Sequence, residues 1–280
     1  MGVPYAEVIG DPIGHSKSPL IHRFWLEKTG CSGDYRSTKV EGGGLPAFLE
    51  RRRADPFWRG CSITAPLKRE AAALLGDPTG ICSWIGAVNC LFRGALGLVP
   101  ANTDFAGIDS ALAGTRIQDE RICLIGAGGA ASAALCYLIG RGPAAIALVA
   151  RDPDKADSLR RRVPASVRDL IGIVPFGEAG SPVRTASLII NATPMGMAGG
   201  PFVAPPLLEG VAGAKAGATM FDMVYAPAET PLLRAARDRG LSCVGGLEML
   251  VGQAAPAFET FFGVKAPRQH DPELLELLTS

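Results

Sequence analysis

The sequence predicts a protein of two α/β domains, and three observations support this fold class. The chain has 280 residues, which is enough for two domains at roughly 150 residues each. Short apolar runs of strand length alternate with helical patterns along the chain, as in sheets that are covered by helices. Glycine is frequent, at 35 residues, and aromatic residues make up only 6% of the chain, which favours α/β structure with many tight backbone turns.

The first hundred residues contain apolar runs that predict strands and amphipathic stretches that predict helices. The expected strands are 6–10 and 60–65, and the expected helices are 19–29, 45–53 and 67–75, with Pro66 at the start of the last one. The helix at 45–53 ends in Arg51, Arg52 and Arg53. Because cations are favourable at a helix C-terminus, we expect these arginines to form a solvated helix end rather than a ligand site.

A second unit begins after residue 104. A helix is expected at 105–112, and the order strand 121–125, glycine turn, helix 130–139, strand 145–149 follows. Apart from Arg121 at the start of the first, both strands are apolar, which is typical of a βαβ unit in a parallel sheet. Further strands are expected at 188–191 and 219–222, a helix at 247–262, and one more helix in the tail to residue 280.

Charge and cysteine usage exclude several classes of protein. The 28 basic and 27 acidic residues nearly cancel, so the chain lacks the overall positive field that non-specific binding of nucleic acid or an anionic membrane requires. The seven cysteines have irregular spacing without a C-x-x-C pair, which argues against a disulfide framework and a zinc knuckle. No secretory signal and no carboxylate cluster beside His15 or His22 is visible, so we expect a cytoplasmic protein without a metal site.

A glycine-rich turn follows the first strand of the βαβ unit. Its sequence, G-x-G-x-x-A, runs from Gly126 to Ala131. Gly126 permits a tight turn, Gly128 allows a pyrophosphate to approach the backbone, and Ala131 keeps the following helix close to the sheet. The helix N-terminus offers unpaired N–H groups to phosphates. In this context the motif predicts a Rossmann-type dinucleotide site, although a purely structural turn is the alternative.

The residues after the second strand bear on the choice of cofactor. An NAD site usually ends this strand in an acidic residue, whereas here the strand ends in Ala150 and Arg151 follows. Arg151 and Lys155 could pair with a 2′-phosphate, while the carboxylate of Asp152 would repel it. We therefore expect NADP, with NAD as the alternative.

A second group of polar residues lies at the ends of the early strands. Lys68 follows 62–64, Asn89 ends the sequence GAVN at 86–89, and Asp104 follows Asn102 and Thr103. Such residues in an open α/β sheet point into one crevice, where a lysine beside a carboxylate can exchange a proton with a substrate hydroxyl. Spacing alone supports a surface salt bridge equally well.

Seven segments, in the same order along the chain, resemble the shikimate dehydrogenase family. They are 10–19 (GDPIGHSKSP), 64–68 (TAPLK), 86–89 (GAVN), 102–104 (NTD), 191–196 (NATPMG), 222–225 (DMVY) and 249–255 (MLVGQAA). The resemblance implies a substrate domain of residues 1–104 and 246–280, a Rossmann-type NADP domain of residues 105–245, and a deep cleft between them. It also implies reversible NADPH-dependent reduction of 3-dehydroshikimate to shikimate, on the route to chorismate and the aromatic amino acids.

The resemblance also implies a role for individual residues. Lys68 and Asp104 would be the catalytic pair. The substrate carboxylate would bind Ser16 and Ser18, with Tyr225 nearby, and the ring hydroxyls would bind Thr64, Asn89 and Gln253. The pyrophosphate would lie on Gly126, Gly128, Gly129 and Ala130, the 2′-phosphate on Arg151 and Lys155, and the nicotinamide and its ribose beside Thr193, Met223 and Gly246.

One departure from the family leaves an alternative open. Family members usually have Asn-Arg-Thr or Asn-Arg-Ser after the second nucleotide strand, where this chain has Ala150, Arg151 and Asp152. An NAD-using quinate/shikimate dehydrogenase is therefore the second hypothesis, although serine at both 16 and 18 fits shikimate better than quinate. A nucleotide-binding sensor without turnover is a third, against which Lys68 and Asp104 argue. Either a monomer or a homodimer is consistent with the sequence.

Overall fold

The computed structural model describes residues 2–75 and 85–279 and divides into two compact units. Unit 1 comprises Met1–Gly107 and Leu250–Ser280, and unit 2 comprises Ile108–Met249. Both divisions fall inside helices, α5 (Asp104–Ala111) and α11 (Gly246–Phe262). The sequence-based domain boundaries at 104/105 and 245/246 instead coincide with the starts of these helices.

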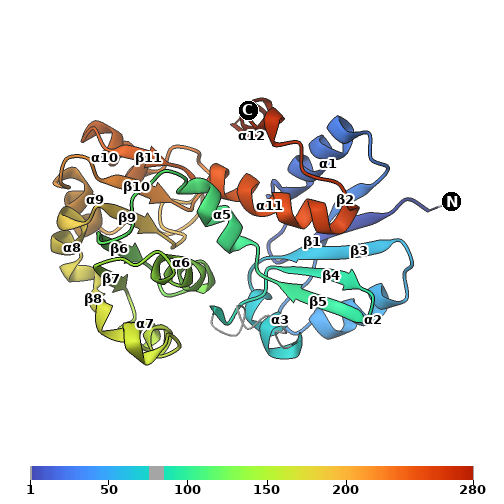
Figure 1. Ribbon diagram of the computed structural model, residues 1–280, viewed down its shortest axis with the longest axis horizontal. Helices are drawn as coiled ribbons and strands as arrows, with labels where there is room; N and C mark the ends of the chain where they lie inside the picture. The colour runs from blue at the N-terminus through green and yellow to red at the C-terminus, as the bar shows by residue number, and fades with distance from the viewer. Residues whose placement is uncertain (1, 76–84, 280) are drawn as a thin grey trace. The chain divides into compact units, whose positions relative to one another are not determined.

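Unit 1 contains a five-stranded sheet in the order β2-β1-β3-β4-β5 (Figure 1). The strands are β1 (Tyr5–Gly10), β2 (Asp34–Lys39), β3 (Trp58–Ile63), β4 (Cys90–Gly94) and β5 (Gly97–Ala101). β1 pairs in parallel with β2 and β3, whereas β4 is antiparallel to β3 and β5. The carboxyl ends of β1, β3 and β5 and the amino end of β4 therefore share one edge of the sheet.

Helices cover both faces of this sheet. They are α1 (Ser18–Thr29), α2 (Leu45–Arg53), α3 (Lys68–Leu75), the unit 1 part of α11, and α12 (Asp271–Thr279), with a short 3₁₀ helix at Arg268–His270. Alternation along β1 sends Tyr5 and Ile9 into a core with residues of α2, and Ala6 and Val8 into a core with Phe261 of α11.

Two details of unit 1 differ from the sequence-based expectation. The strand expected at 60–65 runs from Trp58 to Ile63. Gly60 therefore lies inside the strand, at a close approach where a Cβ would be 2.2 Å from the Leu91 carbonyl oxygen. The helix expected from Leu67 begins at Lys68, so Pro66 lies before the helix rather than in its first turn.

The arginines at the end of α2 do not all face solvent, so that expectation was wrong for one of them. Arg52 donates from Nε to Oε1 of Glu7 (2.6 Å) and from Nη2 to Oε2 (3.0 Å). Glu7 is fully buried in β1, and Thr38 donates a further hydrogen bond to it. A buried carboxylate requires such partners, and the Arg52 side chain is itself only 25% exposed, so it is held against the interior of unit 1 rather than extended into solvent.

Unit 2 contains a six-stranded parallel sheet in the order β11-β10-β9-β6-β7-β8. The strands are β6 (Arg121–Ile125), β7 (Ala145–Ala150), β8 (Ile171–Pro175), β9 (Leu188–Asn191), β10 (Thr219–Asp222) and β11 (Ser242–Val244). Numbered from β6, this is the order 3-2-1-4-5-6 of the Rossmann fold, which reverses direction between β6 and β9. The predicted fold class is thereby confirmed.

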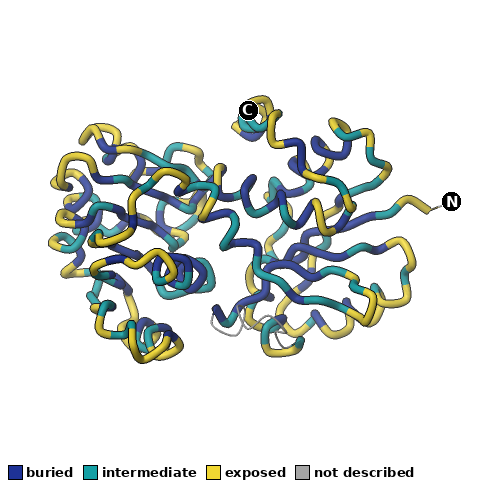
Figure 2. Tube along the Cα trace, viewed as in Figure 1, coloured by how far each residue is buried: buried dark blue, intermediate teal, exposed yellow. Residues whose placement is uncertain are grey.

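The helices of unit 2 connect these strands. They are α6 (Gly129–Ile139), α7 (Pro153–Arg160), α8 (Gly180–Thr185), α9 (Pro205–Ala212) and α10 (Pro231–Asp238), with 3₁₀ helices at Ala165–Leu170 and Phe176–Glu178. Figure 2 shows mostly buried residues along the central strands β6, β9 and β10 and many exposed residues in the connecting loops. Among the helices that the structure describes, none is long and apolar enough to cross a membrane.

Candidate functional site

Unit 1 gathers the predicted catalytic and ring-binding residues at one edge of its sheet. Thr64 follows β3, Lys68 begins α3, Asn89 precedes β4, and Asp104 begins α5 just after β5. Backbone bonds fix this arrangement: Ile63 N–H donates to the Asn89 carbonyl (2.7 Å), and Val88 N–H donates to the Lys68 carbonyl (2.9 Å). Residues that are 36 positions apart in sequence are thereby brought into contact.

Lys68 and Asp104 form a partly desolvated ion pair. Lys68 Nζ donates to Asp104 Oδ2 at 2.6 Å, and the two side chains are 24% and 7% exposed. The other carboxylate oxygen, Oδ1, accepts a hydrogen bond from Asn89 Nδ2 at 2.7 Å. The surface salt bridge that the spacing allowed is excluded, because the carboxylate is buried and held from both sides.

Thr103 connects this pair to the C-terminal segment of unit 1. Its N–H donates to Asn89 Oδ1 (2.7 Å), and its hydroxyl accepts from Asn89 Nδ2 (3.1 Å) and donates to Gln253 Oε1 (3.2 Å). Gln253 lies on α11, 150 positions away in sequence. Thr103 was not among the residues predicted from sequence, although its position between two polar residues at a strand end was an available signal.

Ser16 and Ser18 lie in the loop and first helical turn that follow β1. Ser16 is half-buried and Ser18 is buried, and Ser18 N–H donates to Ser16 Oγ at 3.3 Å. The loop begins at the same sheet edge, since Asp11 N–H donates to the Ala65 carbonyl (3.0 Å). Thr64 is packed there against Gly10, where a Cβ would lie 2.5 Å from Thr64 Cγ2. No hydrogen bond between these serines and Lys68 or Asp104 is present in the described part of the chain.

The glycine turn of unit 2 has the shape that a dinucleotide pyrophosphate requires. Gly126 adopts φ +119°, and a Cβ there would lie 3.0 Å from the Ala192 carbonyl oxygen. A Cβ at Gly128 would meet nothing within 4 Å, so the backbone is open on that side. Gly128 is the N-cap of α6 and provides no side-chain cap, while Ala131 is fully buried against the sheet. Gly129 and Ala130 form the first turn, whose N–H groups suit a phosphate.

The residues after β7 stand beside this turn. Gly126 N–H donates to the Val149 carbonyl (2.8 Å), which brings the end of β7 to the glycine turn. Arg151 and Lys155 are exposed, and neither side chain forms an ion pair within the described residues. Asp152 is the N-cap of α7, and its Oδ1 accepts from the N–H groups of Asp154 and Lys155, both at 3.1 Å. From sequence this carboxylate was expected only to repel a phosphate, and its capping role was not predicted.

A buried polar network positions the residues proposed to border the nicotinamide. Thr193 Oγ1 donates to Asn191 Oδ1 (2.6 Å), and Asn191 Nδ2 donates to Asp222 Oδ1 (2.8 Å). Asp222 is fully buried, and desolvation raises the pKa of its carboxyl. It also accepts from the Val224 N–H (3.1 Å) and from Thr230 Oγ1 (2.6 Å), so the carboxylate joins the end of β9, the segment after β10 and the N-cap of α10. Asn191 and Asp222 end β9 and β10, and neither was predicted from sequence to have a role.

Met223 and Gly246 meet in the same part of unit 2. A Cβ at Gly246 would lie 2.5 Å from the Met223 carbonyl oxygen, so this contact requires glycine. Met223 N–H donates to the Asn191 carbonyl at 3.0 Å. Tyr225 follows two residues later and is half-buried, which raises the pKa of its phenol. Tyr225 belongs to unit 2, whereas Ser16 and Ser18 belong to unit 1.

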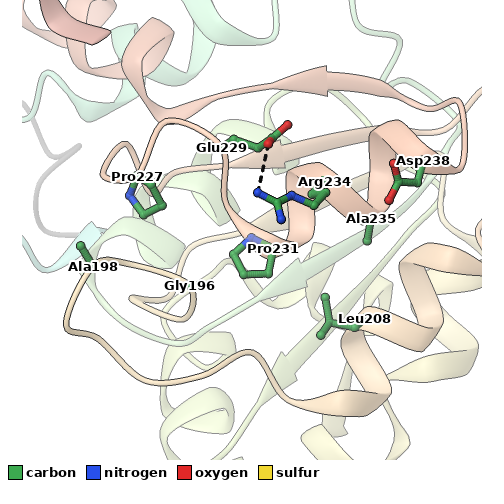
Figure 3. Close-up of a pocket in the computed structure, with 9 residues that line it drawn as sticks. All are labelled: Gly196, Ala198, Leu208, Pro227, Glu229, Pro231, Arg234, Ala235 and Asp238. Carbon is green, nitrogen blue, oxygen red and sulfur yellow. Dashed lines mark hydrogen bonds and ion pairs between the residues drawn. The ribbon is translucent and has the colours of Figure 1, made fainter. Parts of the chain in front are cut away.

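Other candidate groups lie apart from these residues. A hollow of about 570 Å³ lies between the loop after β9 and helix α10, where Arg234 reaches toward Glu229 (Figure 3). None of the predicted site residues lines this hollow.

His15 is exposed and His22 is buried, and the described residues contain no group of three metal-ligating side chains. The thiols of Cys31, Cys61, Cys123, Cys136 and Cys243 are free, and Cys82 lies outside the described residues.

Comparison with known proteins identifies the family of the chain. Residues 8–91 match the substrate binding domain of shikimate dehydrogenase, and residues 246–270 match the shikimate 5′-dehydrogenase C-terminal domain. The chain is 45% identical to a shikimate dehydrogenase (NADP⁺) from Sphingopyxis alaskensis, over 99% of this chain and 97% of that protein.

Solved structures show the same fold over the whole chain. Shikimate 5-dehydrogenase from Thermus thermophilus in complex with NADP(H) and shikimate has a TM-score of 0.83 and 31% identity, covering 98% of this chain and 99% of that one. Quinate dehydrogenase from Corynebacterium glutamicum in complex with NAD has a TM-score of 0.85 and 25% identity, covering 98% and 99%. With these matches along its full length, the chain belongs to the shikimate dehydrogenase family.

Proposed function

We propose that this protein is a shikimate dehydrogenase that catalyses the reversible, NADPH-dependent reduction of 3-dehydroshikimate to shikimate. The observation that carries the proposal is the Lys68–Asp104 pair, which is partly desolvated and held at the sheet edge by Asn89. The Sphingopyxis relative that carries this activity in its name spans nearly the whole chain. Unit 1 binds the substrate and unit 2 binds the cofactor in this proposal.

Lys68 performs the proton transfer in this mechanism. Asp104 fixes the ammonium group in position, and Asn89 in turn fixes Asp104. One N–H of the ammonium donates a hydrogen bond to Asp104, and the other two remain for the substrate oxygen. In the reductive direction the C=O π bond breaks, a C–H bond forms with the incoming hydride, and Lys68 gives a proton to the oxygen. Asp104 holds Lys68 in place by the Nζ–Oδ2 hydrogen bond, and solvent restores the proton that Lys68 has given up.

The remaining unit 1 residues orient the substrate. Thr64, Asn89 and Gln253 present hydroxyl and amide groups for the ring hydroxyls, and Thr103 connects the last two. Ser16 and Ser18, with Tyr225, bind the carboxylate. Holding the ring carbonyl near Lys68 converts the proton transfer into a positioned, unimolecular step.

NADP is the cofactor, and bound NADPH supplies the hydride. Gly126, Gly128, Gly129 and Ala130 would hold its pyrophosphate, and Arg151 and Lys155 the 2′-phosphate. Thr193, Met223 and Gly246 would border the nicotinamide and its ribose. Two observations support the fit of these residues to the cofactor. The backbone at Gly128 is open, and the contact between Gly246 and the Met223 carbonyl leaves no room for a side chain at residue 246.

The NAD-using alternative has weaker support than NADP. The Corynebacterium structure shows that this fold also accommodates a quinate dehydrogenase with NAD, but the more similar Sphingopyxis relative is named for NADP⁺. Measuring kcat/KM for shikimate and quinate, each with NADP⁺ and NAD⁺, tests the proposal by absorbance of the reduced cofactor at about 340 nm. A larger kcat/KM for any pair other than shikimate with NADP⁺ would contradict it, and absence of turnover would favour a sensor.

Two expectations complete the proposal. A cytoplasmic location is supported by the irregular cysteine spacing and by the free thiols. Cell fractionation tests this location. A monomer and a homodimer are both compatible with the reaction, and light scattering after size-exclusion chromatography distinguishes them.

A further inference from the structure

Lys17 stands between the two serines proposed to bind the substrate carboxylate, but its ammonium group is already engaged elsewhere in unit 1. Lys17 Nζ donates to the backbone carbonyl of Leu278 at 2.7 Å. Leu278 lies in the last turn of α12, where the carbonyl groups have no partner within the helix. A cation is favourable there because the C-terminus of a helix carries partial negative charge. Lys17 therefore caps α12.

A second contact fastens the other end of the same helix. Lys28, in the last turn of α1, pairs with Glu273, in the first turn of α12, at 2.8 Å. The start of α1 thus meets the end of α12, and the end of α1 meets the start of α12, so the two helices run antiparallel. Figure 1 shows α12 beside α1 at the C-terminus. Leu274 and Leu278 bury the inner face of α12.

The loop that carries Ser16 depends on this attachment at its end. At its beginning, Asp11 is held by a backbone bond to Ala65 (3.0 Å) and by an ion pair with Lys39 (3.5 Å). Inside the loop, Ser16 N–H donates to the Ile13 carbonyl (3.1 Å). Lys17 occupies the N-cap position of α1, but its side chain makes no capping bond there. Its side-chain bond goes to α12 instead.

We propose that Lys17 is a positioning residue: by capping α12 it fixes the loop so that the Ser16 and Ser18 hydroxyls are arranged for a carboxylate. This rests on the proposed substrate. A preorganised loop loses less conformational freedom when the ligand binds, so the tether acts on affinity. The C-terminal helix α12 then contributes to substrate binding without touching the substrate.

Steady-state kinetics of the full chain give the first test. Lys17→Met should raise KM for shikimate about tenfold, with kcat within about twofold of wild type, because uniform binding is lost rather than transition-state stabilisation. KM for NADP⁺ should not change. Lys28→Met removes the other attachment of α12, far along α1 from the loop, and should leave both KM values near wild type. Lys17→Arg, which can still donate to the carbonyl, should restore most of the affinity.

Hydrogen exchange without any ligand gives the second test, which does not depend on the proposed function. Lys17→Met should speed exchange of the Ser16 and Ser18 amides and of the last turn of α12 by about tenfold, because all three lose the same tether. Lys28→Met should affect only the first turn of α12 and the end of α1. Unchanged exchange at Ser16 and Ser18 in Lys17→Met would overturn the tether.

A direct contact between Lys17 and the substrate carboxylate is the competing explanation. In that case Lys17→Met would weaken shikimate binding far more than binding of its uncharged methyl ester, and loop exchange in the free protein would stay at the wild-type rate. The tether predicts equal fold losses for both ligands. Failure of wild-type protein to turn over shikimate would overturn the proposed function, while the exchange result would still decide the tether.

Discussion

Replacing His22 with phenylalanine should make unit 1 more resistant to acid. The imidazole is fully buried on α1, stacked on Tyr35 with ring centroids 3.9 Å apart, and surrounded by Trp25, Phe258 and Phe261. Neither ring nitrogen has a hydrogen-bond partner within the described residues. Burial therefore lowers the pKa of His22 from 6.5 to about 3.

The sign follows from proton linkage. Below pH 6.5 the unfolded chain protonates His22, whereas the folded protein remains neutral there until about pH 3. The neutral, buried imidazole therefore costs no folding stability above pH 6.5. The free energy of unfolding falls as the pH drops from 6.5 toward 3, because protons bind to the unfolded chain and not to the folded one. At pH 5.0, 1.5 units below the unfolded pKa, the loss is about 2 kcal/mol at 1.36 kcal/mol per unit.

Urea unfolding at pH 7.5 and 5.0 measures this loss. All three tryptophans precede residue 108, so their fluorescence reports on unit 1. Wild type should lose about 2 kcal/mol more between the two pH values than His22→Phe does, whatever the variant's stability at pH 7.5. His15→Gln, which alters an exposed histidine, is the control and should behave like wild type. Equal losses in wild type and His22→Phe would show that His22 does not couple folding to pH.

Three further predictions concern the site. Lys68→Ala should lower kcat about 10²- to 10⁴-fold with a smaller change in KM for shikimate, and near-normal turnover at saturating substrate would refute its proton-transfer role. Thr103→Val keeps the side-chain shape but leaves Asn89 and Gln253 without their link, so KM for shikimate should rise roughly five- to tenfold. Asp152→Ser keeps an N-cap on α7 while removing a charge beside Arg151, so kcat/KM for NADP⁺ should rise about fivefold, roughly 1 kcal/mol. Asp154→Ser, a neighbouring exposed carboxylate, serves as its control, and a gain for NAD⁺ instead would show that Asp152 does not face the 2′ position.

The strands found from sequence are those that bury both faces. The runs at 121–125, 188–191 and 219–222 match β6, β9 and β10 residue for residue, because central strands of a parallel sheet are continuously apolar. The sheet edges were all missed. In β2 only Tyr35 is buried, β5 contains Pro100, and β11 has three residues. An edge strand has a half-solvated surface, so its sequence lacks the apolar run that marks a central strand.

The candidate site likewise contains residues that the sequence could predict and contacts that it could not. Residues at strand ends, such as Lys68, Asn89 and Asp104, could be predicted to converge because strand direction fixes where each strand ends. The bond between Thr103 and Gln253 could not, since it depends on how α11 returns to the first sheet after unit 2. Arg52 was misjudged for a related reason: its partner Glu7 is a carboxylate inside an apolar strand, and that anomaly was the signal.

Asp152 carries a negative charge beside the proposed 2′-phosphate site and also caps helix α7. A free carboxylate beside a phosphate site only repels the phosphate, but this one accepts two backbone N–H groups at the start of α7. Those two amides are thereby withheld from any anion, so the carboxylate would weaken the proposed 2′-phosphate site both by its charge and by occupying donors. Serine at the same position caps the helix with a neutral oxygen, which removes the repulsion and preserves the helix. The difference between this chain and the usual family sequence is therefore expected in cofactor affinity rather than in folding stability.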